Sequence, residues 1–204
     1  MMIKRPIFVT GIGTGIGKTI VSAVLVEKLK ADYWKPIQSG DLDDNDTANV
    51  KSLVSNDSTH FHLEAYKLTQ PYSPHKSAAL DGIKIALESI CIPKTNNQLI
   101  IEGAGGFMVP LNDNHLIIDL IKELDAEVIL VSKNYLGSIN HTLMSATILK
   151  MKGIPIKKLI FNGEEDQSSE KYISQYLKID YLKIPHFHEL NRKSIQEFAQ
   201  HFQF

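Results

Sequence analysis

Short apolar runs alternate along the chain with longer segments in which apolar residues recur at helical spacing. Parallel strands covered on both faces are apolar throughout, so strands of this kind separated by helices produce such a pattern. We therefore expect an α/β fold, a parallel sheet covered by helices on both faces. The predicted strands cover residues 7–9, 33–36, 99–102, 127–132 and 158–162, with a further short strand at 183–184.

Helices are predicted between these strands. The segment 19–30 places four apolar residues on one helix face, namely Ile20, Val24, Leu25 and Leu29, and such a face packs on a sheet. Further helices are predicted at residues 47–53, 77–91 and 139–151. The polar segment 163–169 is typical of a surface loop.

Length and charge limit the kinds of protein this chain can be. A length of 204 residues with 43% hydrophobic residues favours one domain with a sizeable core, and we expect residues 1–204 to form it. Lysine and arginine total 22 against 23 acidic residues, which disfavours non-specific binding to nucleic acid or anionic membranes. No apolar run approaches the ~18 residues of a membrane span. We expect neither nucleic acid nor membrane as a partner.

Cysteine content indicates the compartment. Cys91 is the only cysteine, which excludes an intrachain disulfide and a cysteine-built zinc site. The first apolar run, residues 7–9, is too short for the hydrophobic region of a secretory signal. We therefore expect a reducing, cytoplasmic setting.

The glycine-rich segment TGIGTGIGKT, residues 10–19, follows a predicted strand and opens a predicted helix. Phosphate-binding loops occupy this position, because glycines let backbone amides turn toward phosphate oxygens at a helix N-terminus. In such a loop Lys18 reaches the outer phosphates and the Thr19 hydroxyl ligates Mg²⁺. The sequence predicts a nucleoside triphosphate site and a fold of the P-loop NTPase type.

The loop is one residue longer than the standard motif, because five residues rather than four separate Gly11 from Gly17. A dinucleotide-binding loop is the alternative explanation of the glycines. It is disfavoured because Gly-Lys-Thr suits a triphosphate, and because Asp32 precedes the second strand instead of closing it as a ribose-binding acid would.

Two more segments place charged residues at the ends of predicted strands. Lys35 ends the second strand, where open α/β sheets bind ligands, and suits an anionic substrate or a transferring phosphoryl group. Glu102 ends the apolar run LIIE, as an acidic metal residue does in phosphate-loop enzymes. The acidic run 41–46 offers further oxygen ligands for Mg²⁺. Taken alone, Lys35 is equally compatible with a surface lysine at a strand end, and the acidic run is more often a solvated loop.

These motifs resemble those of the dethiobiotin synthetase family over nearly the full length of the chain. Besides the longer glycine loop, the matching segments are WKPIQSG (34–40), YSPH (72–75), EGAGG (102–106) and LGSINH (136–141). The resemblance implies an enzyme that uses ATP and Mg²⁺ to carboxylate 7,8-diaminononanoate with CO₂ (bicarbonate). It would form dethiobiotin, ADP and phosphate through a carbamate and a carbamic–phosphoric anhydride.

The resemblance also implies roles for individual residues. The triphosphate would be bound by Gly13, Thr14, Gly15, Ile16, Gly17, Lys18 and Thr19, and the adenine by Asn162. Mg²⁺ would be bound by Thr19, Asp46 and Glu102, with Asp43 and Asp44 as neighbouring alternatives to Asp46. The diamine and its carbamate would meet Lys35, Ser39 and Thr14, and Lys18 and Lys35 would be the catalytic residues. The substrate carboxylate would be bound by the helix start Gly137, Ser138, Ile139 and Asn140 of the other subunit of a homodimer, since a helix N-terminus attracts a carboxylate.

Three other functions have less support. The histidine pairs His60/His62 and His186/His188 lack the three or four supported ligands that zinc needs. A nucleotide-switched partitioning or regulatory ATPase would share the fold, but the signature lysine of such proteins would stand at Gly13. An amide-forming enzyme usually needs a glutaminase with a nucleophilic cysteine, and Cys91 lacks that context.

Overall fold

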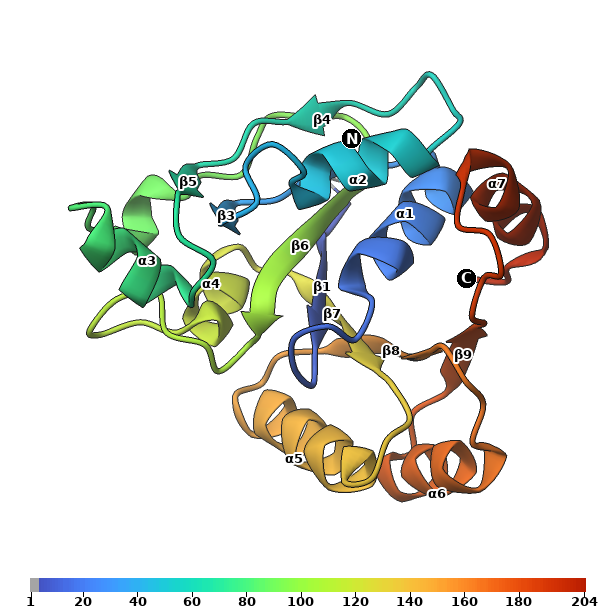
Figure 1. The fold of residues 1–204 in the computed structure, drawn as a ribbon. Helices are drawn as coiled ribbons and strands as arrows, with labels where there is room; N and C mark the ends of the chain where they lie inside the picture. Colours follow the sequence, from blue (N-terminus) through green and yellow to red (C-terminus); the bar gives the residue numbers. More distant parts are fainter. Residues whose placement is uncertain (1–3) are drawn as a thin grey trace.

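A parallel sheet runs through the middle of the protein (Figure 1). The computed structural model describes residues 4–204; residues 1–3, which the single-domain expectation includes, lie outside the described residues. Within the described part, the strand order is β4-β2-β6-β1-β7-β8-β9. The strands are β1 (Ile7–Gly11), β2 (Asp32–Trp34), β4 (Phe61–His62), β6 (Leu99–Gly106), β7 (Glu127–Ser132), β8 (Ile156–Asn162) and β9 (Tyr181–Ile184). A separate parallel pair joins β3 (Ile37–Ser39) to β5 (Tyr66–Leu68).

Helices cover both faces of the sheet (Figure 1). On one face lie α1 (Lys18–Leu29), α2 (Asp46–Leu53) and α7 (Arg192–His201). On the other lie α4 (Ile117–Glu123), α5 (Ser138–Met151) and α6 (Gln167–Leu177). The helix α3 (Pro74–Leu80) packs beside β3 and β5. The predicted α/β architecture is confirmed. Among residues 4–204, no helix has both the length and the hydropathy that crossing a bilayer requires.

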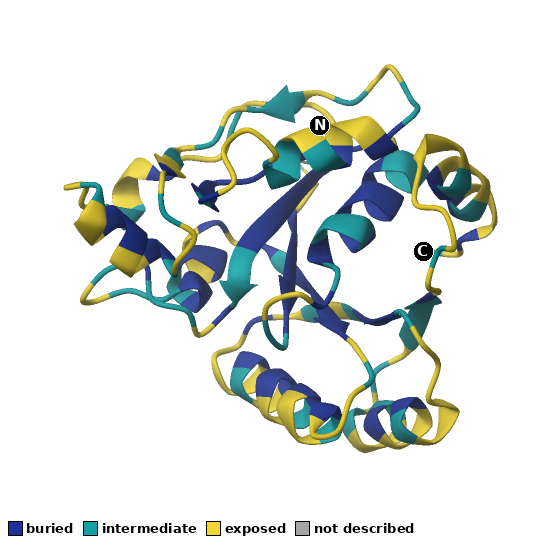
Figure 2. Ribbon diagram, viewed as in Figure 1, coloured by how far each residue is buried: buried dark blue, intermediate teal, exposed yellow. Residues whose placement is uncertain are grey.

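Each face of the sheet has its own apolar core, because neighbouring residues of a strand point to opposite sides. In β1, Phe8 belongs to the core that α4 and α5 cover, whereas Ile7 and Val9 belong to the core under α1. Figure 2 shows the central strands buried and the outer surfaces of the helices exposed. Burial on both faces explains why these strands are uninterrupted apolar runs in the sequence.

Strand register fixes which residues end at the same edge of the sheet. Val9 pairs with Glu102 between β1 and β6, and Trp34 pairs with Ile101 between β2 and β6. The segments that follow β1, β2 and the middle of β6 therefore meet at the carboxyl edge, where α/β proteins bind ligands.

The helix predicted for residues 77–91 is present only as far as Leu80, and the prediction is wrong for the rest of that segment. The helix α3 ends at Leu80, Gly82 has a left-handed φ of 67°, and residues Leu87–Ser89 form a single 3-10 turn. Beyond Gly82 the chain covers the sheet in irregular conformation, with Ile85 and Ile90 buried. The spacing of these apolar residues reflects packing rather than a helical period.

Several elements of the structure are absent from the sequence predictions. The predicted loop 163–169 contains the start of α6, where the Asp166 carboxylate accepts a hydrogen bond from the Ser169 amide over 3.1 Å. The helix α7 has apolar residues at helical spacing, Ile195, Phe198 and Ala199 with Phe202 just after it, a pattern from which an amphipathic helix could have been predicted. The helix α4 and the strands β3, β4 and β5 are too short to show a clear period of apolar residues.

Candidate functional site

The glycine-rich loop joins β1 to α1 at the carboxyl edge of the sheet. Gly15 and Gly17 have φ values of 70° and 90°, which glycine adopts without strain. A Cβ atom at Gly13 or Gly15 would meet nothing within 4 Å. The loop therefore leaves open space at the start of α1, where a helix N-terminus attracts anions.

Lys18 starts α1 and extends along the loop. Its ammonium donates a hydrogen bond to the carbonyl oxygen of Gly13 over 3.2 Å. Burial lowers the pKa of Lys18, and the carboxylate of Glu102 opposes that effect. The ammonium is thereby held beside the open space of the loop, as binding of outer phosphates requires.

Thr19, Asp46 and Glu102 belong to distant segments and form one hydrogen-bonded group. The Oγ1 of Thr19 lies 3.0 Å from Oδ1 of Asp46 and 3.0 Å from Oε1 of Glu102. Glu102 is 1% exposed on β6, and Asp46 starts α2. Of the three alternatives in the acidic run, it is Asp46, and not Asp43 or Asp44, that makes these contacts.

This set of oxygen donors fits Mg²⁺. Among the described residues there is no group of three or more histidine, cysteine, aspartate or glutamate side chains arranged to hold a metal. Mg²⁺ does not need such a cage, because it binds through one or two carboxylates and completes its coordination with phosphate and water. The carboxylates of Asp46 and Glu102 and the hydroxyl of Thr19 meet that requirement.

Lys35 lies between the two carboxylates. Its Nζ is 2.5 Å from Oδ2 of Asp46 and 3.5 Å from Oε1 of Glu102, and it donates to the carbonyl oxygen of Gly103 over 3.2 Å. Burial favours a lower pKa for Lys35, but Glu102 and Asp46 outweigh burial and raise it. Burial favours a higher pKa for Asp46, but Lys35 lowers it. The site therefore holds a charged ammonium against two carboxylates.

A cleft of about 710 Å³ contains these groups, a volume typical of small-molecule sites. The predicted site residues that line it are Thr14, Gly15, Gly17, Lys18, Thr19, Lys35, Ser39, Asp46 and Glu102. The Oγ of Ser39 is buried without a hydrogen-bond partner in residues 4–204, so it is available to a bound molecule. Part of the YSPH motif, Tyr72, Ser73 and Pro74, forms another part of the wall.

Ile16 and Asn162 contact the glycine-rich loop on its protein side, away from the cleft. Ile16 is buried, and the side-chain amide of Asn162 donates to its carbonyl oxygen over 3.1 Å. Asn162 also packs against Gly17, where an added Cβ would lie 2.0 Å from its Nδ2. Binding of adenine by Asn162 stays a prediction.

The helix start at Gly137 does not line the cleft of its own chain. Gly137 has a φ of 103° and precedes Ser138, the first residue of α5. The structure describes one chain. Binding of a substrate carboxylate by residues 137–140 of a second subunit therefore stays a prediction.

Two buried residues that contact the site have no role predicted from the sequence: Tyr33, and Gln38 within the motif WKPIQSG. The hydroxyl of Tyr33 donates to Oε2 of Glu102 over 3.0 Å, and the backbone amide of Asp46 lies 3.4 Å from Oε1 of Gln38. Burial raises the pKa of Tyr33 well above its usual value. The spacing of two residues between Tyr33 and Lys35 was the available signal, since such residues share one face of an extended segment.

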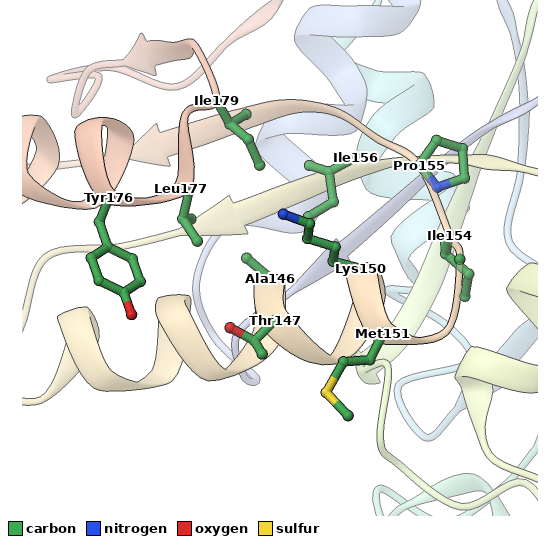
Figure 3. A pocket seen from close by; sticks show the side chains of 11 residues that line it. Ala146, Thr147, Lys150, Met151, Ile154, Pro155, Ile156, Tyr176, Leu177 and Ile179 are labelled. Atoms are coloured by element: carbon green, nitrogen blue, oxygen red, sulfur yellow. The ribbon is translucent and has the colours of Figure 1, made fainter.

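A second pocket, of about 700 Å³, lies between α5 and the segment that joins α6 to β9 (Figure 3). Aliphatic side chains such as Ile154, Ile156 and Leu177 form most of its wall. Among its described lining residues, Lys150 is the one that carries a charge. The pocket offers neither carboxylates nor a glycine-rich loop, so the first cleft is the one that fits a triphosphate with a divalent cation.

Comparison with known proteins gives concordant matches. A family model described as an AAA domain matches residues 5–194. The ATP-dependent dethiobiotin synthetase BioD of Christiangramia forsetii is 49% identical over 199 residues, covering 96% of this chain and 94% of that protein. The protein of the same name from Cytophaga hutchinsonii is 50% identical over 170 residues, covering 83% of this chain and 82% of its own length.

Solved structures match the fold. The cell division ATPase MinD of Pyrococcus furiosus aligns with a TM-score of 0.61 and 13% identity, covering 97% of this chain and 98% of its own. At that identity the likeness concerns the fold alone. It confirms the predicted fold of the P-loop NTPase type.

Proposed function

The chain belongs to the ATP-dependent dethiobiotin synthetases, a family of ligases, and we propose that it closes the cyclic urea of dethiobiotin from 7,8-diaminononanoate, CO₂ and ATP. One observation carries the proposal: Lys18, Lys35 and Glu102 come from distant segments and line a single cleft. We propose that residues 1–204 act as a single domain.

The glycine-rich loop is proposed to hold the triphosphate of ATP. Gly13 and Gly15 leave open space that a side chain would occupy, and the N-terminus of α1 favours negative charge there. Lys18, already directed along the loop toward Gly13, neutralises oxygens of the terminal phosphates. The loop and lysine together align ATP for attack on its terminal phosphoryl group.

Thr19, Asp46 and Glu102 are the residues that would hold Mg²⁺. The support is their shared hydrogen-bonded group of oxygen atoms. When bound, Mg²⁺ supplies positive charge that offsets the charge of the triphosphate.

Lys35 and Ser39 are proposed to act on the second substrate. One amine of the diamine takes up CO₂ as a carbamate, and a carbamate oxygen attacks the terminal phosphoryl group while ADP leaves. The other amine then attacks the carbon of the mixed anhydride, closes the ring and expels phosphate. Lys35 stabilises the oxygens on which charge develops, and Ser39 offers its unpartnered hydroxyl. Transfer of this kind depends on alignment and charge rather than on a protein nucleophile.

A homodimer is proposed to complete the substrate site. The support is the helix start 137–140, which lies outside its own cleft and has the N-terminal position that attracts a carboxylate. In a dimer it would bind the carboxylate of the diamine held by the other subunit.

Incubation with ATP, Mg²⁺, bicarbonate and 7,8-diaminononanoate tests the proposed function. We expect mass spectrometry to detect the cyclic urea, with phosphate released in equal amount and only when both diamine and bicarbonate are present. A nucleotide-switched ATPase or an amide-forming enzyme would ignore that pair. ATP hydrolysis that is independent of diamine and bicarbonate, with no urea formed, would therefore contradict the proposal.

A further inference from the structure

The two carboxylate oxygens of Glu102 have different partners. Oε1 faces the cleft, where it accepts from the Thr19 hydroxyl over 3.0 Å and lies 3.5 Å from the ammonium of Lys35. Oε2 accepts a hydrogen bond from the hydroxyl of Tyr33 over 3.0 Å. Glu102 thus presents one oxygen to the cleft and has the other bound from the protein interior.

Tyr33 is held firmly enough to fix this orientation. Its side chain is completely buried, and its ring packs 6.0 Å from that of Phe61, centroid to centroid. Tyr33 pairs with Ile100 on the neighbouring strand β6, and Glu102 follows Ile100 by two residues on the same face. The hydroxyl therefore reaches Glu102 along one face of two hydrogen-bonded strands, a rigid part of the fold.

The number of oxygens that a carboxylate presents affects which cation it suits. Mg²⁺ is small and demands nearly octahedral coordination, whereas Ca²⁺ accepts six to eight oxygens and often takes both oxygens of one carboxylate. With Oε2 directed to Tyr33, Oε1 is the oxygen of Glu102 that contacts the cleft residues Thr19 and Lys35. Without that hydrogen bond, the carboxylate is free to rotate and offer both.

We propose that Tyr33 is a positioning residue that holds Glu102 with a single oxygen toward the cleft and thereby favours Mg²⁺ over Ca²⁺. The inference rests on the proposed function, because it assumes a cation at Glu102. The proposal assigns to Tyr33 a role in selecting the cation, in addition to donating a hydrogen bond to a buried carboxylate. A purely structural hydroxyl would affect stability and leave the preference between the two cations unchanged.

Titration calorimetry of the Tyr33→Phe variant tests the proposal. Mg²⁺ and, separately, Ca²⁺ are titrated into the full chain saturated with the β,γ-imido analogue of ATP, without diamine. We expect the affinity for Mg²⁺ to fall about tenfold, the size of effect typical when a group that orients a metal ligand is removed. The affinity for Ca²⁺ should stay equal or rise, so that the ratio of the two affinities shifts toward Ca²⁺.

Tyr66→Phe is the matched control. It removes a hydroxyl that also has a hydrogen-bond partner inside the protein, since it accepts from the backbone amide of Ala86 over 3.0 Å. Tyr66 does not line the cleft. This variant should keep both affinities of the unmodified chain. The Tyr33→Phe shift should also disappear in a Glu102→Gln background, because Glu102 transmits it.

Several results would overturn the proposal. They are an unchanged ratio of affinities in Tyr33→Phe, the same shift in Tyr66→Phe, no cation binding by the unmodified chain, or a Tyr33→Phe chain that does not fold. Failure of the proposed function gives a different result. A chain that forms no dethiobiotin but shows the expected shift would contradict the diamine chemistry and support the role of Tyr33.

Discussion

The ammonium of Lys35 lies 2.5 Å from Oδ2 of Asp46 and 3.5 Å from Oε1 of Glu102, so one buried cation links the two carboxylates of the site. In Lys35→Ala we expect kcat for urea formation to fall about 10²- to 10³-fold. That is the usual effect of removing one preorganised group that stabilises developing charge. Product formation followed by mass spectrometry measures the loss.

Lys150→Ala is the control for this change. It removes a lysine from the second pocket and should retain full turnover. Nearly unchanged kcat in Lys35→Ala would show that the cleft does not use its ammonium.

Replacement of Lys18 by alanine should weaken nucleotide binding as well as turnover. Its ammonium lies along the glycine-rich loop, 3.2 Å from the carbonyl oxygen of Gly13, where it faces the expected site of the outer phosphates. We expect the affinity for ATP to fall and kcat to fall about 10²-fold or more. Equilibrium binding of the imido analogue and steady-state kinetics measure the two effects separately. Unchanged binding and turnover together would exclude phosphate contact by Lys18.

Two glycines of the loop should respond differently to alanine. At Gly17, an added Cβ would lie 2.0 Å from the amide nitrogen of Asn162, and φ is 90°. Left-handed backbone alone costs about 1–2 kcal/mol for a residue with a side chain, so Gly17→Ala should lower the free energy of unfolding by at least that amount. At Gly13, the Cβ would meet nothing within 4 Å, so stability should be unchanged while affinity for the imido analogue falls.

Urea unfolding and nucleotide titration of the two variants check this difference. Equal stability losses at Gly13 and Gly17 would contradict the packing of Asn162 under the loop. Unchanged nucleotide affinity in Gly13→Ala would contradict the assignment of the open space to phosphates.

Stability at low pH should depend on Asp32, which is buried at the start of β2. Burial favours a higher pKa, but hydrogen bonds from Thr95, Asn97 and His60 outweigh it and lower the pKa of Asp32 below 3.8. A lowered pKa in the folded state stabilises that state above the unfolded value, and the contribution is lost as pH falls through the folded value. Asp32→Asn should therefore be less stable than the unmodified chain near neutral pH.

The difference in free energy of unfolding should shrink as pH falls below 3.8, the unfolded pKa. Urea titrations at several pH values measure it. Asp113→Asn, a change at an exposed loop position, is the control and should differ little from the unmodified chain at every pH. A difference for Asp32→Asn that does not vary with pH would contradict the lowered pKa.

The sequence predicts most of the sheet, because its strands are buried on both faces. Such strands form short apolar runs that are too short for helices of the usual length. The strand predicted at 127–132 matches β7, whereas β6 extends four residues beyond the predicted end at Glu102. The extension consists of the small residues Gly103, Ala104, Gly105 and Gly106; Gly105 has a left-handed φ of 74°, and pairing with β1 resumes after a register shift, where Gly106 lies opposite Gly11.

At the candidate site, Lys35 and Glu102 were identified by residue type and by their place at the end of predicted apolar strands, together with the family motifs that contain them. These signals were not sufficient to choose among three aspartates, because the conformation of the loop 41–46 decides which carboxylate reaches Thr19. Tyr33 occupies an apolar position of a core strand, and its hydroxyl alone has a polar partner. Contacts of that kind depend on the register of neighbouring strands, which no single segment encodes.

The pairing of Val9 with Glu102 also has a use in engineering. Backbone hydrogen bonds between two central strands set the separation of the glycine-rich loop from Glu102, whereas the outward faces of α5, α6 and α7 have no part in it. We expect substitutions on the outward faces of those helices to leave the site intact, provided that an interface between subunits is spared. Such substitutions could, for example, immobilise the protein on a solid support.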